Sequence, residues 1–161
     1  MRRFKRGDEV YARPGKDRIG TFAKCISINE GDLANKPRAL TMEEAASIPL
    51  VGLTAWQALI EGAHLKKGQK VFIQAGSGGV GTFAIQLAKH VGAFVATTST
   101  ANVNLVKSLG AAVVIDYTKK DFEKHLHDYD VVLNSLGAEA LEEVPRCAKS
   151  RRKAHLDLRS A

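Results

Sequence analysis

The chain has 161 residues, of which 45% are hydrophobic and 25% are charged, and its formal net charge is +7. This balance is typical of a globular protein, and no apolar run is long enough to cross a membrane. Its two cysteines, Cys25 and Cys147, form no disulfide framework and are too few for a zinc lobe, so we expect no metal site and a cytoplasmic, reducing environment.

Two strand-like runs lie in residues 1–40, GDEVYA at 7–12 and GTFAKCISI at 20–28. Thr41 and Glu44 then form a Thr-x-x-Glu capping box, which predicts the start of a helix. We therefore expect β structure at first and helical structure after it.

The predicted helix covers residues 43–48, and Pro49 should interrupt it because proline has no backbone N–H to donate. A second helix is predicted from Leu53 to Glu61, followed by a turn at 66–68. Both precede the segment with the main functional motif.

The stretch from Lys70 to Ala93 reads as a buried strand, a glycine-rich turn and a helix in immediate succession. The apolar run at 71–73 predicts the strand, and the G-x-G-x-x-G motif of Gly76, Gly78 and Gly81 opens the helix. The apolar side of this helix should be formed by Phe83, Ile85, Leu87, Ala88 and Val91.

Such a turn is suited to a dinucleotide pyrophosphate. The first glycine permits a tight turn, the second lets the backbone approach the diphosphate, and the third lets the helix lie close to the strand. The positive end of the helix then faces the anion. A phosphate-binding P-loop is excluded because no Lys-Ser or Lys-Thr follows the last glycine. The alternative is a tight turn that binds nothing.

Strands and helices continue to alternate after the motif. Strands are predicted over 94–100, 112–117 and 130–137, and helices over 103–111 and 121–129. This order predicts an α/β fold with a Rossmann-type parallel sheet, helices on both faces and the ligand at the carboxyl ends of the strands. A complete sheet of this type has about six strands, so we expect an incomplete one of about four.

The end of the second predicted strand bears on the identity of the cofactor. NAD enzymes usually have an acidic residue there for the ribose 2′-hydroxyl, but this chain has Thr97, Thr98, Ser99 and Thr100. Hydroxyls can donate to a 2′-phosphate, so NADPH is favoured over NADH. The alternative is that these residues are only β-favouring and that the nearest cation, Lys107, points elsewhere.

The chain resembles the zinc-independent quinone oxidoreductase branch of the medium-chain dehydrogenase/reductase superfamily. The resemblance covers residues 2–143 and rests on FKRGDEVYAR, GTFAKCISI, LTMEEAASIPLVGLTAWQAL, AGSGGVGTFAIQLAK, SLGAAVVIDYT and DVVLNSLG. It implies an NADPH-dependent reductase of quinones or α,β-unsaturated carbonyls, as the alkenal reductases are. It also implies that residues 1–40 are the last part of a GroES-like catalytic domain and that 41–143 form a partial NAD(P)-binding Rossmann domain.

The resemblance implies cofactor contacts at Thr54, Ser77, Gly78, Gly79, Val80, Ser99, Tyr117 and Ser135. The residues from Ser77 to Val80 would hold the pyrophosphate. Ser99 and Tyr117 would contact the region of the adenosine 2′-phosphate, and Thr54 would lie near the nicotinamide. The lysine that family members often have shortly after the position of Ser99 is missing in this sequence.

Two of these positions have an ordinary structural interpretation as well. Thr54 could occupy a helix start with its hydroxyl on a backbone group, and Tyr117 could close a strand end. The resemblance identifies no general acid, base or nucleophile, so the catalytic residues stay unassigned.

Residues 144–161 depart from the family pattern. They contain six Lys and Arg against one Asp, a charge of +5, which leaves +2 for the other 143 residues. Synonymous codons for 143–161, read one nucleotide later, spell KSLAVLNPGGKLISISGP, which resembles the family's next strand. We therefore expect a basic, frameshifted tail without a strand. The alternative is an RNA-binding extension, but the tail has no aromatic residue to stack on bases, so we expect no nucleic acid or membrane partner.

The expected function is hydride transfer from NADPH to a small-molecule quinone or α,β-unsaturated carbonyl. The alternative is a truncated, catalytically inactive nucleotide-binding fragment, because the substrate pocket would lie outside these residues. Full-length members of the family commonly form homodimers through late strands that this sequence lacks.

Overall fold

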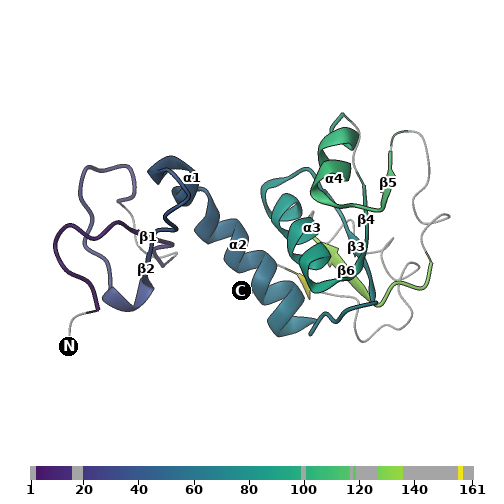
Figure 1. Cartoon of the computed structure of the whole chain (residues 1–161), viewed down its shortest axis with the longest axis horizontal. Helices are drawn as coiled ribbons and strands as arrows, with labels where there is room; N and C mark the ends of the chain where they lie inside the picture. Colours follow the sequence, from purple (N-terminus) through teal and green to yellow (C-terminus); the bar gives the residue numbers. More distant parts are fainter. Residues whose placement is uncertain are drawn as a thin grey trace. The chain divides into compact units, whose positions relative to one another are not determined.

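The computed structural model describes residues 3–15, 20–98, 101–116, 118, 127–135 and 156–157. Contacts divide the chain into two compact units, Met1–Leu50 and Val51–Ala161 (Figure 1). The predicted domain boundary at residue 41 and the predicted tail from residue 144 stay predictions.

The first unit is built on a pair of short antiparallel strands. β1 (Val10–Ala12) pairs with β2 (Leu33–Asn35), and Val10 lies opposite Asn35. A 3₁₀ helix, η1 (Glu30–Asp32), leads into β2, and the side chain of Asn29 caps it. β1 confirms the strand predicted in GDEVYA.

The second predicted strand of this unit is wrong. Residues 20–28 contain no strand, and the Phe22 side chain is fully exposed. A strand needs a neighbour for its backbone N–H and C=O groups. β1 pairs instead with β2, which the sequence pattern did not predict.

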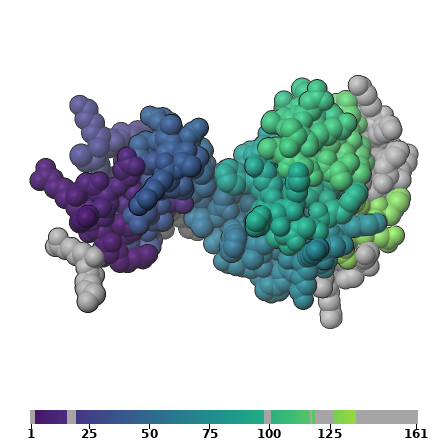
Figure 2. Space-filling view, viewed as in Figure 1, coloured from purple at the N-terminus to yellow at the C-terminus, as the bar shows by residue number. Residues whose placement is uncertain are grey.

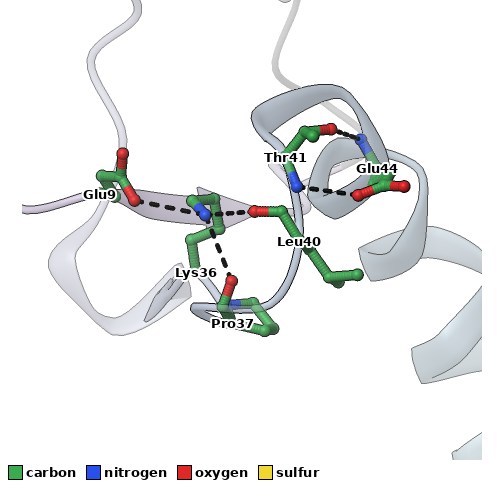
Figure 3. A network of polar contacts seen from close by, with 6 residues as sticks. All are labelled: Glu9, Lys36, Pro37, Leu40, Thr41 and Glu44. Carbon is green, nitrogen blue, oxygen red and sulfur yellow. Dashed lines mark hydrogen bonds and ion pairs between the residues drawn. The ribbon is translucent and has the colours of Figure 1, made fainter.

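Lys36 connects the two strands to the segment that follows them (Figure 3). Its side chain is only 6% exposed, and Nζ lies 3.3 Å from Glu9 Oε2. Nζ also donates to the backbone oxygens of Pro37, at 3.2 Å, and Leu40. The Lys36 backbone N–H donates to the Glu9 backbone oxygen as well. One cation thus joins Glu9, before β1, to the segment 37–40, after β2.

The predicted capping box is confirmed at the start of α1 (Met42–Ala46). The Glu44 N–H donates to Thr41 Oγ1 at 3.2 Å, and the Thr41 N–H donates to Glu44 Oε2 at 2.9 Å (Figure 3). Both bonds use N–H groups that a helix start otherwise leaves without an acceptor.

The second helix begins earlier than predicted. α2 spans Ile48–Trp56, so Pro49 lies in its first turn instead of interrupting a helix, and the predicted start at Leu53 is wrong. Proline is tolerated there because the first N–H groups of a helix have no intrahelical acceptor. The chain continues as a π-helix, η2 (Gln57–Gly62), in which the Ala63 N–H donates to the Ala58 oxygen at 3.0 Å.

The second unit contains a parallel sheet in the strand order β5-β4-β3-β6-β7. Its strands are β3 (Lys70–Ile73), β4 (Phe94–Thr98), β5 (Val113–Ile115), β6 (Val131–Asn134) and β7 (Leu156–Asp157). The first four confirm the predicted Rossmann-type sheet, and every pair of neighbours is parallel.

β7 corrects the expectation that the tail has no strand. Leu156 pairs with Leu133 and Asp157 with Asn134, on the outer side of β6. A sheet edge offers unpaired backbone groups to any extended segment, so a two-residue strand can form without alternating side chains.

The helices α3 (Gly79–Val91) and α4 (Val103–Leu109) cover one face of this sheet (Figure 1). Their outer surfaces, teal to green, face the viewer in Figure 2. Ala84, Ile85 and Ala88 are fully buried against the sheet, whereas Phe83 and Leu87 are only partly buried. Of the residues predicted for this side of the helix, Ile85 and Ala88 are thus the most buried. Ala84 and Ala88 are small, which lets the helix lie close to the strands.

The other face of the sheet carries a smaller apolar cluster of Phe72, Ala96, Ile115, Tyr129 and Val132. Most of the helix predicted over 121–129 lies outside the described residues, and its last described part, 127–129, is not helical. Among the described residues, helices therefore cover only the α3 face.

Candidate functional site

The topology of the sheet identifies the edge at which a ligand would bind. The chain runs from β3 outward to β4 and β5, and then returns to place β6 on the other side of β3. Because the strands are parallel, all their carboxyl ends lie at one edge. In open parallel sheets the crevice that takes the ligand lies where the strand order reverses, and in this sheet that point is between the ends of β3 and β6.

The glycine turn begins at this crevice. Ala75 has a left-handed backbone with φ of 52°, and the Gly78 N–H donates to its oxygen at 2.9 Å. Gly76 has no positive φ, so the left-handed residue of the turn is Ala75 and not the first glycine of the motif.

Gly76 and Gly81 are required by close packing. A Cβ on Gly76 would lie 1.9 Å from Thr97 Oγ1, and a Cβ on Gly81 would lie 2.3 Å from the Ala75 oxygen. Neither position has room for a side chain. The close approach predicted for the third glycine is confirmed.

The start of α3 is open on its outer side. Gly78 and Gly79 are exposed, and a Cβ on Gly78 would come no closer than 3.3 Å to another atom. The first bond of the helix runs from the Thr82 N–H to the Gly78 oxygen, so the N–H groups of Gly79, Val80 and Gly81 have no acceptor within the helix.

These N–H groups lie at the positive end of a helix of 13 residues with no acidic side chain in its first turn. Backbone donors and a positive dipole end together favour a phosphate anion. Residues 77–80, predicted from the sequence as pyrophosphate contacts, are all in this turn.

Thr54 lies on α2, which runs close to the turn. A Cβ on Gly79 would lie 3.0 Å from Val51 Cγ1, and Thr54 is one helical turn after Val51 on the same side of the helix. Its side chain is partly buried. Ser135 is exposed directly after β6, on the other side of the crevice.

The structure at the end of β4 rules out one of the hydroxyl residues suggested for the 2′-phosphate. Thr97 is fully buried, and its hydroxyl donates to the Ile73 oxygen at 2.6 Å, so it is committed to the sheet and not available to a 2′-phosphate. Ser99, Thr100 and Tyr117 lie outside the described residues. Lys107 is exposed in the last turn of α4.

The sequence reasoning missed two residues with buried side-chain amides near the crevice. Gln74 is 2% exposed at the carboxyl end of β3, and Asn134 is 4% exposed at the end of β6. They are neighbours in register, since Ile73 pairs with Leu133 and the Gln74 N–H donates to the Leu133 oxygen at 3.0 Å. The sequence feature that could have revealed them is the polar residue at the end of each apolar run, in VFIQ and VVLN.

The described residues hold neither a metal cluster nor a membrane span. Within the ranges that the structure describes, no three His, Cys, Asp or Glu residues lie close enough together to hold a metal ion. None of the helices in these ranges has the length and apolarity to cross a bilayer. The Cys25 thiol is free and exposed.

Comparisons of sequence and of fold both find oxidoreductases similar to this chain. A family described as "Zinc-binding dehydrogenase" matches residues 79–155. The chain is 42% identical over 144 residues to "NAD(P)H oxidoreductase RTN4IP1, mitochondrial" of Danio rerio, and this match covers 84% of this chain and 37% of the relative. It is 41% identical over 143 residues to "NADPH-dependent alkenal/one oxidoreductase, chloroplastic" of Arabidopsis thaliana, with 83% and 37% covered.

A similar solved structure is the quinone oxidoreductase of Escherichia coli in complex with NADPH. Its TM-score is 0.84 at 29% identity, and the match covers 94% of this chain and 48% of that one. The chain thus spans 37% of the length of the two curated relatives above.

The word zinc in the family description finds no counterpart in these residues. The whole sequence has two cysteines, and the described residues hold no cluster of ligands. A structural site needs four such ligands and a catalytic site about three. Neither requirement is met by the part of the chain that the structure describes.

Proposed function

Because the chain belongs to the quinone oxidoreductase and alkenal reductase branch of the medium-chain dehydrogenase/reductase superfamily, we propose that it binds NADPH at the glycine turn and serves hydride transfer to a quinone or an α,β-unsaturated carbonyl. One observation carries the binding step. The start of α3 presents N–H groups without an intrahelical acceptor beside two exposed glycines, at the switch point of a parallel sheet.

The pyrophosphate would be held by the turn of Ser77, Gly78, Gly79 and Val80. Backbone N–H groups do this without a cationic side chain, as in other Rossmann turns. The exposure of Gly78 and Gly79 supports this assignment because a diphosphate must approach the backbone closely.

The two halves of the cofactor would then extend to opposite sides of the turn. Ser99 and Tyr117 are proposed for the adenosine 2′-phosphate, and the absence of an acidic residue at 97–100 favours NADPH over NADH. Thr54 and Ser135 are proposed for the nicotinamide half. The packing of α2 beside Gly79 and the position of Ser135 at the end of β6 support them.

Bound NADPH would supply the hydride from its nicotinamide ring. The chain's own residues would fix the position of the cofactor, through the turn on one side and Thr54 and Ser135 on the other. Such positioning accounts for much of the rate in a reaction that brings two bound partners together. No residue is proposed as a general acid or base.

The proposed acceptor follows from the names of the relatives. One is called an alkenal/one oxidoreductase, another a 2-methylene-furan-3-one reductase, and solved neighbours are called quinone oxidoreductases. These acceptors share a carbonyl conjugated with a double bond. We propose the same class of substrate for the protein to which these residues belong.

A second candidate function is nucleotide binding without turnover. The observation in its favour is that the chain spans 37% of the length of its relatives, while every proposed pyrophosphate contact is present. Binding is therefore proposed of this chain itself, and hydride transfer of the complete protein.

A reducing compartment such as the cytosol is proposed because the two cysteines of the sequence give no disulfide framework. A homodimer and the absence of a nucleic acid partner stay predictions. Two relatives are named as mitochondrial and chloroplastic, so compartment differs within the family.

Turnover is tested by the loss of NADPH absorbance in the presence of a 2-alkenal or a quinone, with NADH in parallel. The proposal predicts NADPH consumption that requires both protein and acceptor. If NADPH saturates the protein and no acceptor of either class is reduced, nucleotide binding without turnover is the better account.

A further inference from the structure

Gln74 is a buried polar residue whose side-chain oxygen the fold leaves unsatisfied. It is 2% exposed at the end of β3, and its Oε1 has no hydrogen-bond partner. A buried carbonyl oxygen without a donor costs free energy, and such atoms are rare in folded proteins. An apolar residue at this position would avoid that cost.

Gln74 lies close to the point where the strand order reverses. Side chains alternate along β3, so Gln74 shares the face of Phe72, on the side of the sheet away from α3. It directly precedes Ala75, which opens the glycine turn, and it is the register neighbour of Asn134 on β6. Gln74 therefore lies at the switch point, between the turn and the end of β6.

The chemistry of the missing partner can be specified. Oε1 is an acceptor, so the partner must be a donor. The phosphates of NADPH have only acceptor oxygens at neutral pH. The adenosine half lies toward β4 in such sites, so the half that passes β6 is the nicotinamide half, whose ribose hydroxyls and carboxamide N–H are donors.

We propose that Gln74 is a cofactor-binding residue whose Oε1 accepts a hydrogen bond from a hydroxyl or amide N–H of the nicotinamide half of NADPH. This inference rests on the proposed function, since it takes the glycine turn to hold the pyrophosphate. The atom is covered in this structure, and rotation of the flexible Gln74 side chain would bring it to the ligand.

The test compares two ligands on one variant. Gln74→Met keeps the length and volume of the side chain and removes the acceptor. It should weaken NADPH binding about tenfold, the value of one hydrogen bond of roughly 1.4 kcal/mol. It should leave the binding of adenosine 2′,5′-bisphosphate, which has no nicotinamide half, unchanged. The melting temperature of the ligand-free variant should be equal to or above that of the original chain.

Gln86→Met is the matched control. Gln86 is exposed on α3, and its Nε2 donates to the Thr82 oxygen of the same helix. The same chemical change there should alter the binding of neither ligand. The acetylpyridine analogue of NADPH, which lacks the amide N–H, distinguishes the two donors. If Gln74→Met still weakens its binding tenfold, the donor is a ribose hydroxyl.

The outcomes separate this inference from the proposed function. Equal NADPH affinity in Gln74→Met and the original chain would overturn the role of Gln74 and leave cofactor binding intact. If Gln74→Met loses affinity for both ligands equally, or has a lowered melting temperature, Gln74 has a structural role such as holding a buried water. No NADPH binding by the original chain would overturn both.

Discussion

Ala75 and Gly76 show how little a motif says about the role of each residue in it. The G-x-G-x-x-G spacing predicts where the turn lies, but Ala75 adopts the left-handed conformation. Gly76 is a glycine because Thr97 of the neighbouring strand occupies the space of a Cβ. That contact depends on the pairing of β3 with β4, which the local sequence does not contain.

The same reasoning applies to Thr97 and Gln74. Both are polar residues at strand ends, and in the sequence Thr97 is indistinguishable from the hydroxyl residues that follow it. In the structure the Thr97 hydroxyl bonds to Ile73 inside the sheet, while Gln74 keeps an unpartnered oxygen. Which face a side chain takes depends on strand register, so this distinction could not be predicted.

The pyrophosphate assignment is tested at Gly79. Gly79→Asp should weaken NADPH binding at least roughly 100-fold, since it places a negative charge beside the diphosphate where the backbone must approach it. Affinity is measured by the fluorescence of the cofactor.

Gly79→Ala is the control for this variant. It introduces the same Cβ, 3.0 Å from Val51 Cγ1, without the charge, and should weaken binding only a few-fold. If both variants lose affinity equally, packing against α2 is the cause, and the charge argument fails.

The 2′-phosphate assignment is tested at Ser99. Ser99→Asp should weaken NADPH binding strongly and leave NADH binding unchanged, because only NADPH places a phosphate against the new carboxylate. Ser99→Ala, which removes the hydroxyl without adding charge, should have a smaller effect. An equal loss of NADPH and NADH in Ser99→Asp would remove Ser99 from the 2′-phosphate site.

At the scale of elements, strong local signals were sufficient for some predictions. The capping box of Thr41 and Glu44 and the buried strand β3 occur as the sequence predicts. The failures depend on partners elsewhere in the chain. Residues 20–28 were predicted as a strand but contain none, and η2 is a π-helix where the sequence pattern predicts an ordinary helix.

The close contact between α3 and the turn predicts a stability effect at Gly81. Gly81→Ala should lower the free energy of unfolding by about 2 kcal/mol or more, because its Cβ would lie 2.3 Å from a backbone oxygen that cannot move freely. This cost exceeds the gain of about 1 kcal/mol in helix propensity. The measurement is urea unfolding followed by circular dichroism.

Gly78→Ala serves as the comparison, since its Cβ would be 3.3 Å from the same Ala75 oxygen. We expect it to change the free energy of unfolding by less than about 1 kcal/mol. Equal effects of the two substitutions would show that the helix can shift to admit a side chain at Gly81.

The Lys36 network predicts an effect confined to the first unit. Lys36→Met should destabilise the β1–β2 pair by about 1–2 kcal/mol, because the carbonyls of Pro37 and Leu40 lose a charged donor. Hydrogen exchange of the β1–β2 amides measures this change.

Glu9→Gln isolates the ion pair in that network. The Glu9 side chain is 66% exposed, and exposed pairs contribute little. Its effect should be clearly smaller than that of Lys36→Met. A Glu9→Gln variant as unstable as Lys36→Met would mean that the ion pair dominates.

At the scale of the whole molecule, alternation of strands and helices was enough to predict the parallel sheet, while its use as a ligand edge stays a prediction. The number of strands could not be predicted, because β7 joins the sheet through backbone pairing without a side-chain pattern. Most of the excess positive charge lies in one segment, since residues 144–161 contribute +5 of the net +7. Charge alone would have suggested a nucleic acid partner that the glycine turn does not support.

The measurement that tests the central claim most directly is a titration of the purified chain with NADPH, followed by cofactor fluorescence, with NADH in parallel and a thermal melt of each sample. We predict saturable NADPH binding, weaker NADH binding and a melting temperature that rises with NADPH. At about 100 times the Kd the added stability should be about 2.7 kcal/mol. A cooperative melt that NADPH does not shift, with no change in fluorescence, would show that the glycine turn only joins β3 to α3 and binds no cofactor.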